Sequence, residues 1–350
     1  MRSDQYQRLG AAVAMLTLLA AACGDDGPTA PEAPVAVETA VIVNSIDLSL
    51  TVFPVDSPQN RRAIGVAQAG SPVSVAARKS VAVVPLGLLS AAAIVDLTSD
   101  AVTSVPLPAN SGATGAAFFD DSTIYVGNPG RNSVTRINVA NEIATAEIDV
   151  GVFPQAIIAS RFWVFVLNGE LDANFQPARA GTITVVDPKS DAVRATIELS
   201  GYNPSAAAFG PDDRLYVINS GRFGQADGSL SVVDPVALVE VEHEPGFGEF
   251  PGDVAVDGDG LVYVSSFAYG IAVWNPAERG FRFSPANPLE LGGHAISSGV
   301  GFDSDGRLYS LIPGDCIAPS VAVRGEGTST EEVGVGVCPY DLAITEVDDA

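Results

Sequence analysis

Two aspartates occupy the same place in two similar segments of this 350-residue chain, Pro251-Gly252-Asp253 and Pro339-Tyr340-Asp341. His294 is one of only two histidines. A histidine placed beside two carboxylates could perform general acid–base catalysis, with or without a divalent metal. Two carboxylates could also contribute to a Ca²⁺ site, although Ca²⁺ takes about 6–8 oxygen ligands. The simpler reading is that both aspartates accept hydrogen bonds from neighbouring loop amides.

Other patterns that would indicate catalysis are missing from the sequence. There is no Gly-x-Ser-x-Gly segment, and no Cys-x-x-Cys or mixed Cys/His spacing that would suit zinc. His243 falls in a segment that reads as an outer, solvent-facing strand. His294 is therefore the one acid–base candidate, and catalysis has little support.

The N-terminal segment indicates export. Arg2 and Arg8 precede an apolar run from residue 9 to 22, which is too short for a membrane span of about 20 residues. The run ends in Leu19-Ala20-Ala21-Ala22-Cys23, which resembles the lipobox of bacterial lipoproteins. That resemblance implies a signal peptide over 1–22 and a diacylglycerol on Cys23. Gly24 replaces the Asp that favours inner-membrane retention, so the outer membrane is the expected site.

Composition sets limits on the partners. The formal net charge is −24, from 18 Lys and Arg against 42 Asp and Glu. Such a surface repels phosphate, which excludes nucleic acid and leaves membrane attachment to the lipid. Residues 23–38 form an acidic, proline-rich tether. The remainder, residues 39–350, is apolar enough for one folded domain, which we expect to be monomeric.

One strand pattern recurs along that domain. Its clearest copies are Tyr125-Val126-Gly127-Asn128, Phe165-Val166-Leu167-Asn168, Tyr216-Val217-Ile218-Asn219 and Tyr263-Val264-Ser265-Ser266. With weaker copies starting at 41, 82 and 309, the pattern returns every 40 to 51 residues. Acidic turns precede several copies, and four units close on a Gly-x-x-Pro corner, at 151–154, 201–204, 248–251 and 336–339. An all-β repeat of this length indicates propeller blades with four strands each.

The repeat resembles the YVTN family of seven-bladed β-propellers, with YncE-like and NHL-like neighbours. The resemblance covers about residues 39–347, and the Trp-Asp and Gly-His signatures of WD40 propellers are absent. We predict an all-β, seven-bladed propeller of four-stranded antiparallel blades. The last strand, 339–344, supplies the inner strand of a blade whose other three strands come from 41–67, which closes the ring.

The cysteines fit this architecture. If Cys23 carries lipid, then Cys316 and Cys338 remain, and an oxidising compartment favours a disulfide between them. A hairpin turning at Gly327 would place the two residues opposite each other, near bridging distance.

In such a propeller, the Gly-x-x-Pro corners and the loops after the recurring strands share one face, here named the corner face. Blades 4 and 5 carry long insertions there, 169–180 and 220–228. Aromatic and arginine side chains at interfaces often act as anchors. The candidate binding residues are Phe153, Tyr202, Phe250, His294, Arg179, Arg222 and Phe223. Alternatively, the rings wedge between blades and the insertions are ordinary loop variation.

These patterns favour a non-enzymatic cell-envelope lipoprotein that binds a protein, peptide or glycan and needs no cofactor, with Ca²⁺ as an open option. The alternative is a propeller lyase or lactonase-like hydrolase that uses His294, Asp253 and Asp341. A third role is assembly of outer-membrane complexes. Fold alone does not choose among them.

Overall fold

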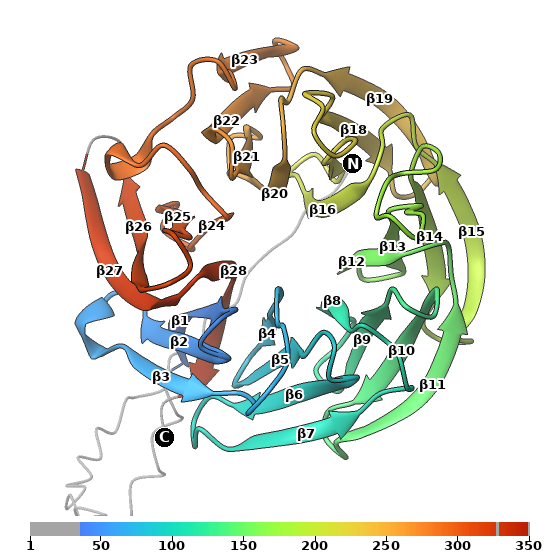
Figure 1. The fold of residues 1–350 in the computed structure, drawn as a ribbon, viewed down its shortest axis with the longest axis vertical. Helices are drawn as coiled ribbons and strands as arrows, with labels where there is room; N and C mark the ends of the chain where they lie inside the picture. Colours follow the sequence, from blue (N-terminus) through green and yellow to red (C-terminus); the bar gives the residue numbers. More distant parts are fainter. Residues whose placement is uncertain (1–35, 327–328, 349–350) are drawn as a thin grey trace, which may run out of the picture. The chain divides into compact units, whose positions relative to one another are not determined.

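A computed structural model describes residues 36–326 and 329–348, and these residues form seven four-stranded antiparallel sheets arranged in a ring (Figure 1). The blades are numbered from the one that contains both ends of the domain. From the inner to the outer strand, blade 1 comprises β28(Pro339–Asp348), β1(Ala36–Asn44), β2(Ser49–Pro54) and β3(Arg62–Gly65). Blade 2 comprises β4(Ala76–Arg78), β5(Val81–Pro85), β6(Ala91–Asp96) and β7(Val102–Pro106). Blade 3 comprises β8(Thr114–Phe118), β9(Thr123–Asn128), β10(Ser133–Asn138) and β11(Ile143–Asp149). Blade 4 comprises β12(Pro154–Ala159), β13(Val164–Asn168), β14(Thr182–Asp187) and β15(Ala192–Glu198). Blade 5 comprises β16(Pro204–Phe209), β17(Leu215–Asn219), β18(Ser229–Asp234) and β19(Val239–Pro245). Blade 6 comprises β20(Pro251–Val256), β21(Val262–Ser266), β22(Gly270–Asn275) and β23(Gly280–Phe283). Blade 7 comprises β24(Gly299–Phe302), β25(Leu308–Ile312), β26(Pro319–Glu326) and β27(Ser329–Val337). Two single-turn 3₁₀ helices, η1(Pro58–Asn60) and η2(Leu291–Gly293), lie in connections.

The ring closes as predicted. β28 pairs with β1 from Ala36 opposite Asp348 to Val43 opposite Asp341, so the last strand becomes the inner strand of blade 1. Closure leaves neither end of the ring with an unpaired inner edge, which an open array of sheets would expose. The seven-bladed, four-stranded fold expected from the repeat is therefore confirmed. The first strand begins at Ala36, slightly before the predicted domain start.

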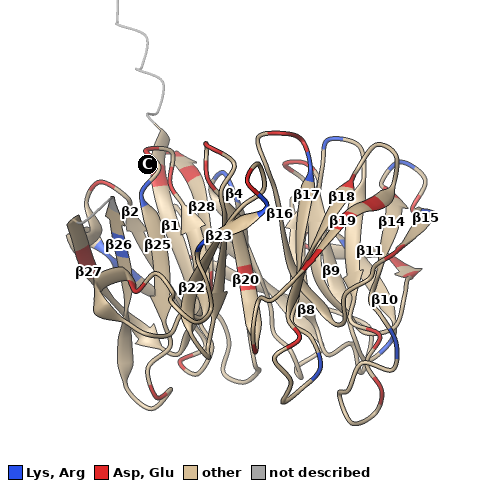
Figure 2. Cartoon of the chain, turned by 90° about the horizontal axis from the view of Figure 1, so that it is seen from above, with Lys and Arg blue, Asp and Glu red and all other residues tan. Residues whose placement is uncertain are grey.

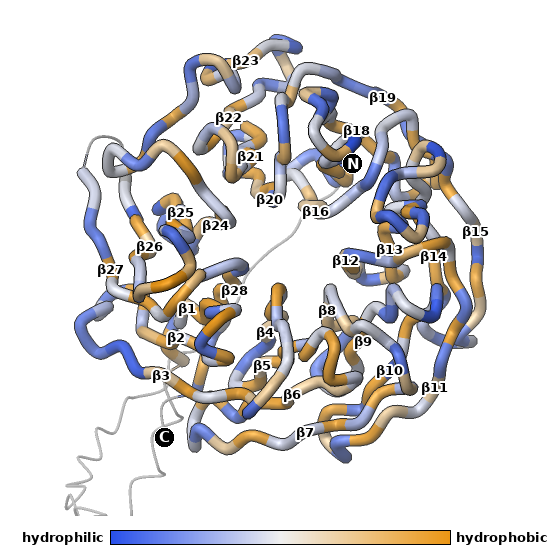
Figure 3. The backbone as a smooth tube through the Cα atoms, viewed as in Figure 1, coloured by the Kyte–Doolittle hydropathy of each residue, from blue (hydrophilic) through white to orange (hydrophobic). Residues whose placement is uncertain are grey.

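Position within the blade explains the residue types of each strand. The second and third strands lie between two neighbouring blades, so both of their faces are buried; every residue of β13 is buried, as are the first five of β14. Strands covered on both faces carry continuous apolar runs. The outer strand β15 covers one face only and is mostly exposed. Figure 3 shows hydrophobic residues concentrated in the strands, and cores such as that of Phe165, Ile183 and Val217 join adjacent blades.

Side-chain hydrogen bonds fix both ends of the recurring Tyr-Val-x-Asn strand. The tyrosine hydroxyl donates to an aspartate of a nearby turn, as in Tyr216 to Asp212 at 3.0 Å and Tyr309 to Asp303 at 3.1 Å. The terminal asparagine is fully buried, and its Nδ2 donates to two hydroxyls of the third strand. For Asn168 these are Thr182 Oγ1 and Thr184 Oγ1, both at 3.0 Å. The asparagines therefore tie the second strand to the third.

Three of the four Gly-x-x-Pro corners, those that begin at Gly151, Gly201 and Gly336, pack their glycine against one of these asparagines. A Cβ added to Gly151 would lie 2.5 Å from Asn168 Nδ2, and Gly201 is packed against Asn219 in the same way. Only glycine leaves room for the buried amide. The residue before the corner proline takes a left-handed conformation, with φ of 58° at Phe153, 50° at Phe250 and 59° at Cys338. At these corners, residues other than glycine thus adopt the left-handed conformation through which the backbone changes direction.

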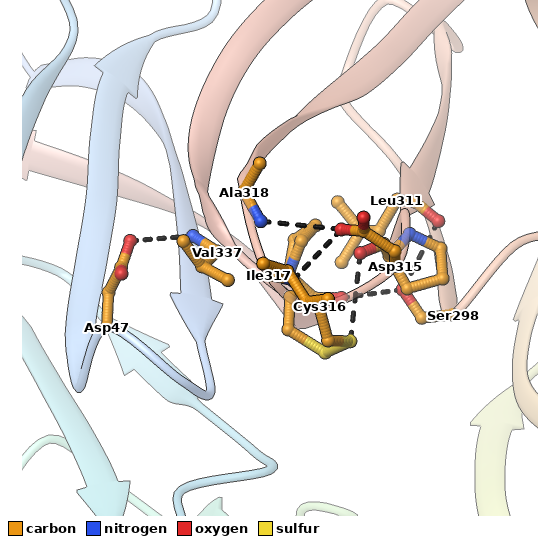
Figure 4. The surroundings of a disulfide bond; sticks show 11 residues. Asp47, Ser298, Leu311, Asp315, Cys316, Ile317, Ala318 and Val337 are labelled. Carbon is orange, nitrogen blue, oxygen red and sulfur yellow. Dashed lines mark hydrogen bonds between the residues drawn. A yellow bond between two sulfur atoms is a disulfide. The ribbon is translucent and has the colours of Figure 1, made fainter.

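Cys316 and Cys338 form the predicted disulfide, with Cα atoms 4.5 Å apart (Figure 4). Its setting differs from the expected pair of opposed strand residues. β26 begins only at Pro319, so Cys316 lies in the loop after β25, and Cys338 lies in the corner that starts β28. The bond joins blade 7 to blade 1 beside the closure. Asp47 of blade 1 reinforces this junction by accepting a hydrogen bond from Val337 N at 2.6 Å.

The predicted signal peptide, Cys23 and most of the tether lie outside the described residues. Within the described ranges, no helix is long and apolar enough to cross a bilayer.

Candidate functional site

The two faces of the propeller are built from different connections. Inner strands begin at the corner face, and the second strands return to it, so the loops between second and third strands lie there too. Backbone hydrogen bonds join these loops to the corners, from Gly169 N to Phe153 O at 2.9 Å and from Ser220 N to Asn203 O at 2.9 Å. The opposite face, here named the turn face, carries the tight acidic turns. β1 begins and β28 ends there.

A cavity of about 490 Å³ lies at the propeller axis among the starts of the inner strands, so it belongs to the corner face. Residues from all seven inner-strand segments line it. Its polar side chains are Ser74, Thr114, Gln155, Ser205, Ser220, Asp253, Ser298, Tyr340 and Asp341. Phe250 and Phe267 also line the cavity, and the Phe267 and Tyr340 rings lie 5.7 Å apart. The cavity combines carboxylates, hydroxyls and aromatic rings.

Asp253 and Asp341 lie in this cavity, as the shared Pro-x-Asp spacing predicted. Asp253 Oδ2 accepts a hydrogen bond from Val300 N of the next inner strand at 2.9 Å, and Oδ1 accepts one from Val254 N at 2.8 Å. Asp341 repeats the arrangement with Val75 N at 2.9 Å and Leu342 N at 2.8 Å. Both aspartates thus accept hydrogen bonds from neighbouring amides, as the simpler reading expected, but only the Val75 amide lies in a loop and the other three belong to inner strands. Each carboxylate oxygen keeps further acceptor capacity.

The surroundings of the two carboxylates favour their protonated forms. Burial raises the pKa of Asp253, against the two backbone hydrogen bonds that lower it. Burial also raises the pKa of Asp341, and the negative charge of Asp253 raises it further. Among residues 36–326 and 329–348, no Lys, Arg or His forms an ion pair with either carboxylate. The cavity therefore holds two acidic groups for which the described chain supplies no counter-charge.

His294 does not join the aspartates. It follows η2, which packs on β26 and β27, and its Nε2 lies 2.9 Å from Glu332 Oε1 on the outermost strand of blade 7. It does not line the axial cavity. The three-residue set His294, Asp253 and Asp341 is thus not assembled, because the connection before β24 carries the histidine to the rim of its blade. Within the described ranges, no three His, Cys, Asp or Glu residues gather as a metal site.

The aromatic corner residues and the insertions do come together. The Phe153 and Phe175 rings are 5.7 Å apart, and those of Phe223 and Phe250 are 5.3 Å apart. The Arg222 guanidinium lies 4.9 Å from the centre of the Tyr202 ring.

The arginines of both insertions form ion pairs within their own loops. Arg222 pairs with Asp227 at 2.7 Å, and Arg179 with the buried Glu170 at 2.9 Å. Phe247, another aromatic at a corner, is instead fully buried against Trp274 and Phe281. The insertions therefore fold over the corners as ordered loops.

The structure adds a feature that sequence reasoning missed. In the described part of the chain, six of the seven loops between second and third strands present an exposed large apolar side chain. We name these residues the loop tips; with their exposed fractions they are Ile46 (60%), Leu88 (87%), Phe175 (66%), Phe223 (70%), Phe267 (38%) and Ile317 (82%). The signal for these residues in the sequence was that each of the six closely follows a copy of the recurring strand. The loop tips form an apolar ring on the corner face, which also holds the acidic cavity. Figure 2 shows Asp and Glu positions in loops at both edges of the propeller.

Comparison with known proteins is informative about architecture. No protein-family model and no curated protein matches the chain. Among solved structures, hydrazine synthase from Kuenenia stuttgartiensis is similar at a TM-score of 0.65 and 16% identity, over 81% of this chain and 97% of that one. A functionally unknown protein from Desulfotomaculum acetoxidans DSM 771 is similar at 0.64 and 14%, over 89% and 99%. A streptogramin B lyase is similar at 0.60 and 12%, over 76% and 84%. The likeness shows the fold alone.

Proposed function

We propose that this protein is a cell-envelope lipoprotein of YVTN/YncE-like, NHL-like type whose propeller binds a protein or peptide partner on its corner face. The observation that carries the proposal is the ring of six exposed apolar loop tips around the mouth of the axial cavity. The six tips occupy the same loop in six blades, and exposed large apolar side chains gathered on one face are typical of interaction surfaces.

A protein partner suits this ring better than a glycan. Ile46, Leu88 and Ile317 are aliphatic, and such side chains bury well against the apolar side chains of another polypeptide. The aromatic tips Phe175 and Phe223 pack edge-on against corner rings, which gives them rigid positions suited to anchoring. The described chain enters the propeller at the start of β1, on the turn face.

Binding is favoured over the lyase or lactonase-like alternative by the position of His294. A general base must lie within hydrogen-bond reach of the reacting proton, directly or through one water. His294 lies instead against Glu332 on the outer strand of blade 7. Asp253 and Asp341 both engage backbone amides, which suits a binding cavity.

Site-specific photocrosslinking in cells tests the proposed interface. A benzoylphenylalanine placed at Phe175, Phe223 or Ile317 should give a discrete crosslinked product in the envelope fraction. The matched control is Phe162, which is 55% exposed in the turn between β12 and β13 on the opposite face. Equal crosslinking from Phe162, or none from the three tips, would count against a corner-face partner.

Lipidation is tested separately. Metabolic labelling with an alkyne fatty acid should mark the wild-type protein and leave the Cys23→Ser variant unlabelled and released from membranes. Labelling that persists in Cys23→Ser would contradict the lipoprotein assignment, and fractionation would show whether the protein reaches the outer membrane.

A further inference from the structure

The axial cavity has a chemical character that the apolar ring does not explain. It contains two carboxylates, whose side chains come from β20 and β28, and the described chain supplies no cation to either. Ionised carboxylates taken out of water are stable only when they are paired or well hydrogen-bonded. Each of these carboxylates has two backbone N–H donors but no opposite charge.

A second observation concerns the cavity wall. Ser74 lines the cavity beside Val75, whose N–H donates to Asp341, and Ser74 Oγ is shielded from solvent without a hydrogen-bond partner. An unsatisfied buried hydroxyl costs free energy that a ligand donor or acceptor would recover. A ligand that reached this hydroxyl would gain from a hydrogen-bonding head group.

A third observation concerns the aromatic rings. Phe267 and Tyr340 lie against each other in the cavity lining, and Phe250, at the corner before β20 of the same blade as Phe267, also lines it. Aromatic faces attract ammonium and guanidinium groups and also accept the apolar stem that carries them. Inorganic cations such as Ca²⁺ fit less well, because two carboxylates provide few of the oxygens that such ions require.

From these features we propose that the axial cavity accepts one lysine or arginine side chain from the partner that docks on the corner face. The charged head lies between Asp253 and Asp341, the stem lies against Phe267 and Tyr340, and residues flanking the basic side chain contact the apolar loop tips. This inference rests on the proposed function and adds the chemistry of the partner. The acidic net charge of −24 is complementary to such a basic segment.

The test uses small probes with the folded propeller at pH 8. N-acetyl-lysine methylamide should bind in calorimetry at least about tenfold more tightly than N-acetyl-norleucine methylamide, which has the same stem without the charge, because one charge-assisted hydrogen bond is worth about 1.5–3 kcal/mol. The D253N/D341N variant should lose this preference. The control D259N/D305N removes two exposed carboxylates from the turn face, of which Asp305 pairs with Arg307, and should keep the preference.

Several outcomes would overturn the inference. Equal binding of the lysine and norleucine probes would show a purely apolar cavity, and absence of binding by both would remove the site. Tighter binding of n-butylamine than of the lysine probe would assign the cavity to free amines rather than to a partner side chain. Loss of lysine binding in D259N/D305N would show that net charge alone is responsible.

The outcomes also separate this inference from the proposed function. The probes are too small to span the loop tips, so F175S/F223S should bind N-acetyl-lysine methylamide as the wild type does. Lysine binding without crosslinking at the tips would leave the cavity assignment intact and contradict the docking surface. Crosslinking without lysine binding would do the reverse.

Discussion

Asp341, on the last strand of the chain, accepts a 2.9 Å hydrogen bond from the backbone N–H of Val75, which precedes it by 266 residues. The bond joins the inner strand of blade 1 to the start of blade 2, and Asp253 joins blades 6 and 7 in the same way. A carboxylate at this position thus has a structural role at the ring closure and also supplies charge to the axial cavity. The two roles make its protonation state consequential.

We predict that the aspartate pair makes stability fall as pH rises. The pKa of both carboxyls is raised in the folded state, so their contribution is complete below the unfolded value of about 3.9 and is lost as pH rises through the folded values. Tyr340 is the other titratable side chain lining the cavity, and it stays neutral in this range. Thermal unfolding between pH 4 and 8 should show a smaller decline in Tm for D253N/D341N than for wild type.

The matched variant D259N/D305N should keep the wild-type pH profile, since its charges lie in exposed turns. The same decline in Tm for all three proteins would mean that the aspartate pair does not cause it. D253N/D341N should also be less stable than wild type at pH 4, because an amide nitrogen cannot accept the backbone N–H that each replaced oxygen accepted.

The Cys316–Cys338 bond should stabilise the closed ring. It encloses a segment with a sequence separation of 22 residues, for which chain-entropy arguments give about 3 kcal/mol. C316S/C338S should lower the free energy of unfolding by about that amount in urea titrations. Reductant should destabilise the wild type to a similar extent and leave C316S/C338S unchanged; an effect of reductant on the variant would point to another cause.

Gly151 and Asn168 should be energetically coupled. Gly151→Ala places a methyl group 2.5 Å from the buried Asn168 amide, so it should destabilise the fold by about 1–3 kcal/mol. Asn168→Ala should cost a similar amount, since it removes hydrogen bonds to Thr182 and Thr184. In a double-mutant cycle, Gly151→Ala should cost less in the Asn168→Ala background, where only the Cβ at 2.9 Å remains. Additive costs would contradict this explanation of the corner glycine.

The loop tips should matter for binding and little for folding. Phe175 and Phe223 are 66% and 70% exposed, so F175S/F223S should change the free energy of unfolding by no more than about 0.5 kcal/mol per site. The same variant should lose the crosslink formed from Ile317 on the corner face, while F162S keeps it. A large loss of stability in F175S/F223S would mean that the tips serve packing.

The division between what the sequence determined and what the tertiary structure decided follows the range of the interactions involved. The repeat, the four strands per blade and the closing pair of β28 with β1 follow from local patterns, because the blades bury similar apolar strands. The pairing of Cys316 with Cys338 followed from the cysteine count and the expected compartment, whereas its position in a loop and a corner did not. The shared Pro-x-Asp spacing likewise placed Asp253 and Asp341 at the axis. The sequence could not separate His294 from them, because the path of an irregular connection depends on packing against β26 and β27. Nor could it show that apolar side chains from loops far apart in the chain share one face with an acidic cavity, since that arrangement exists only once seven blades close.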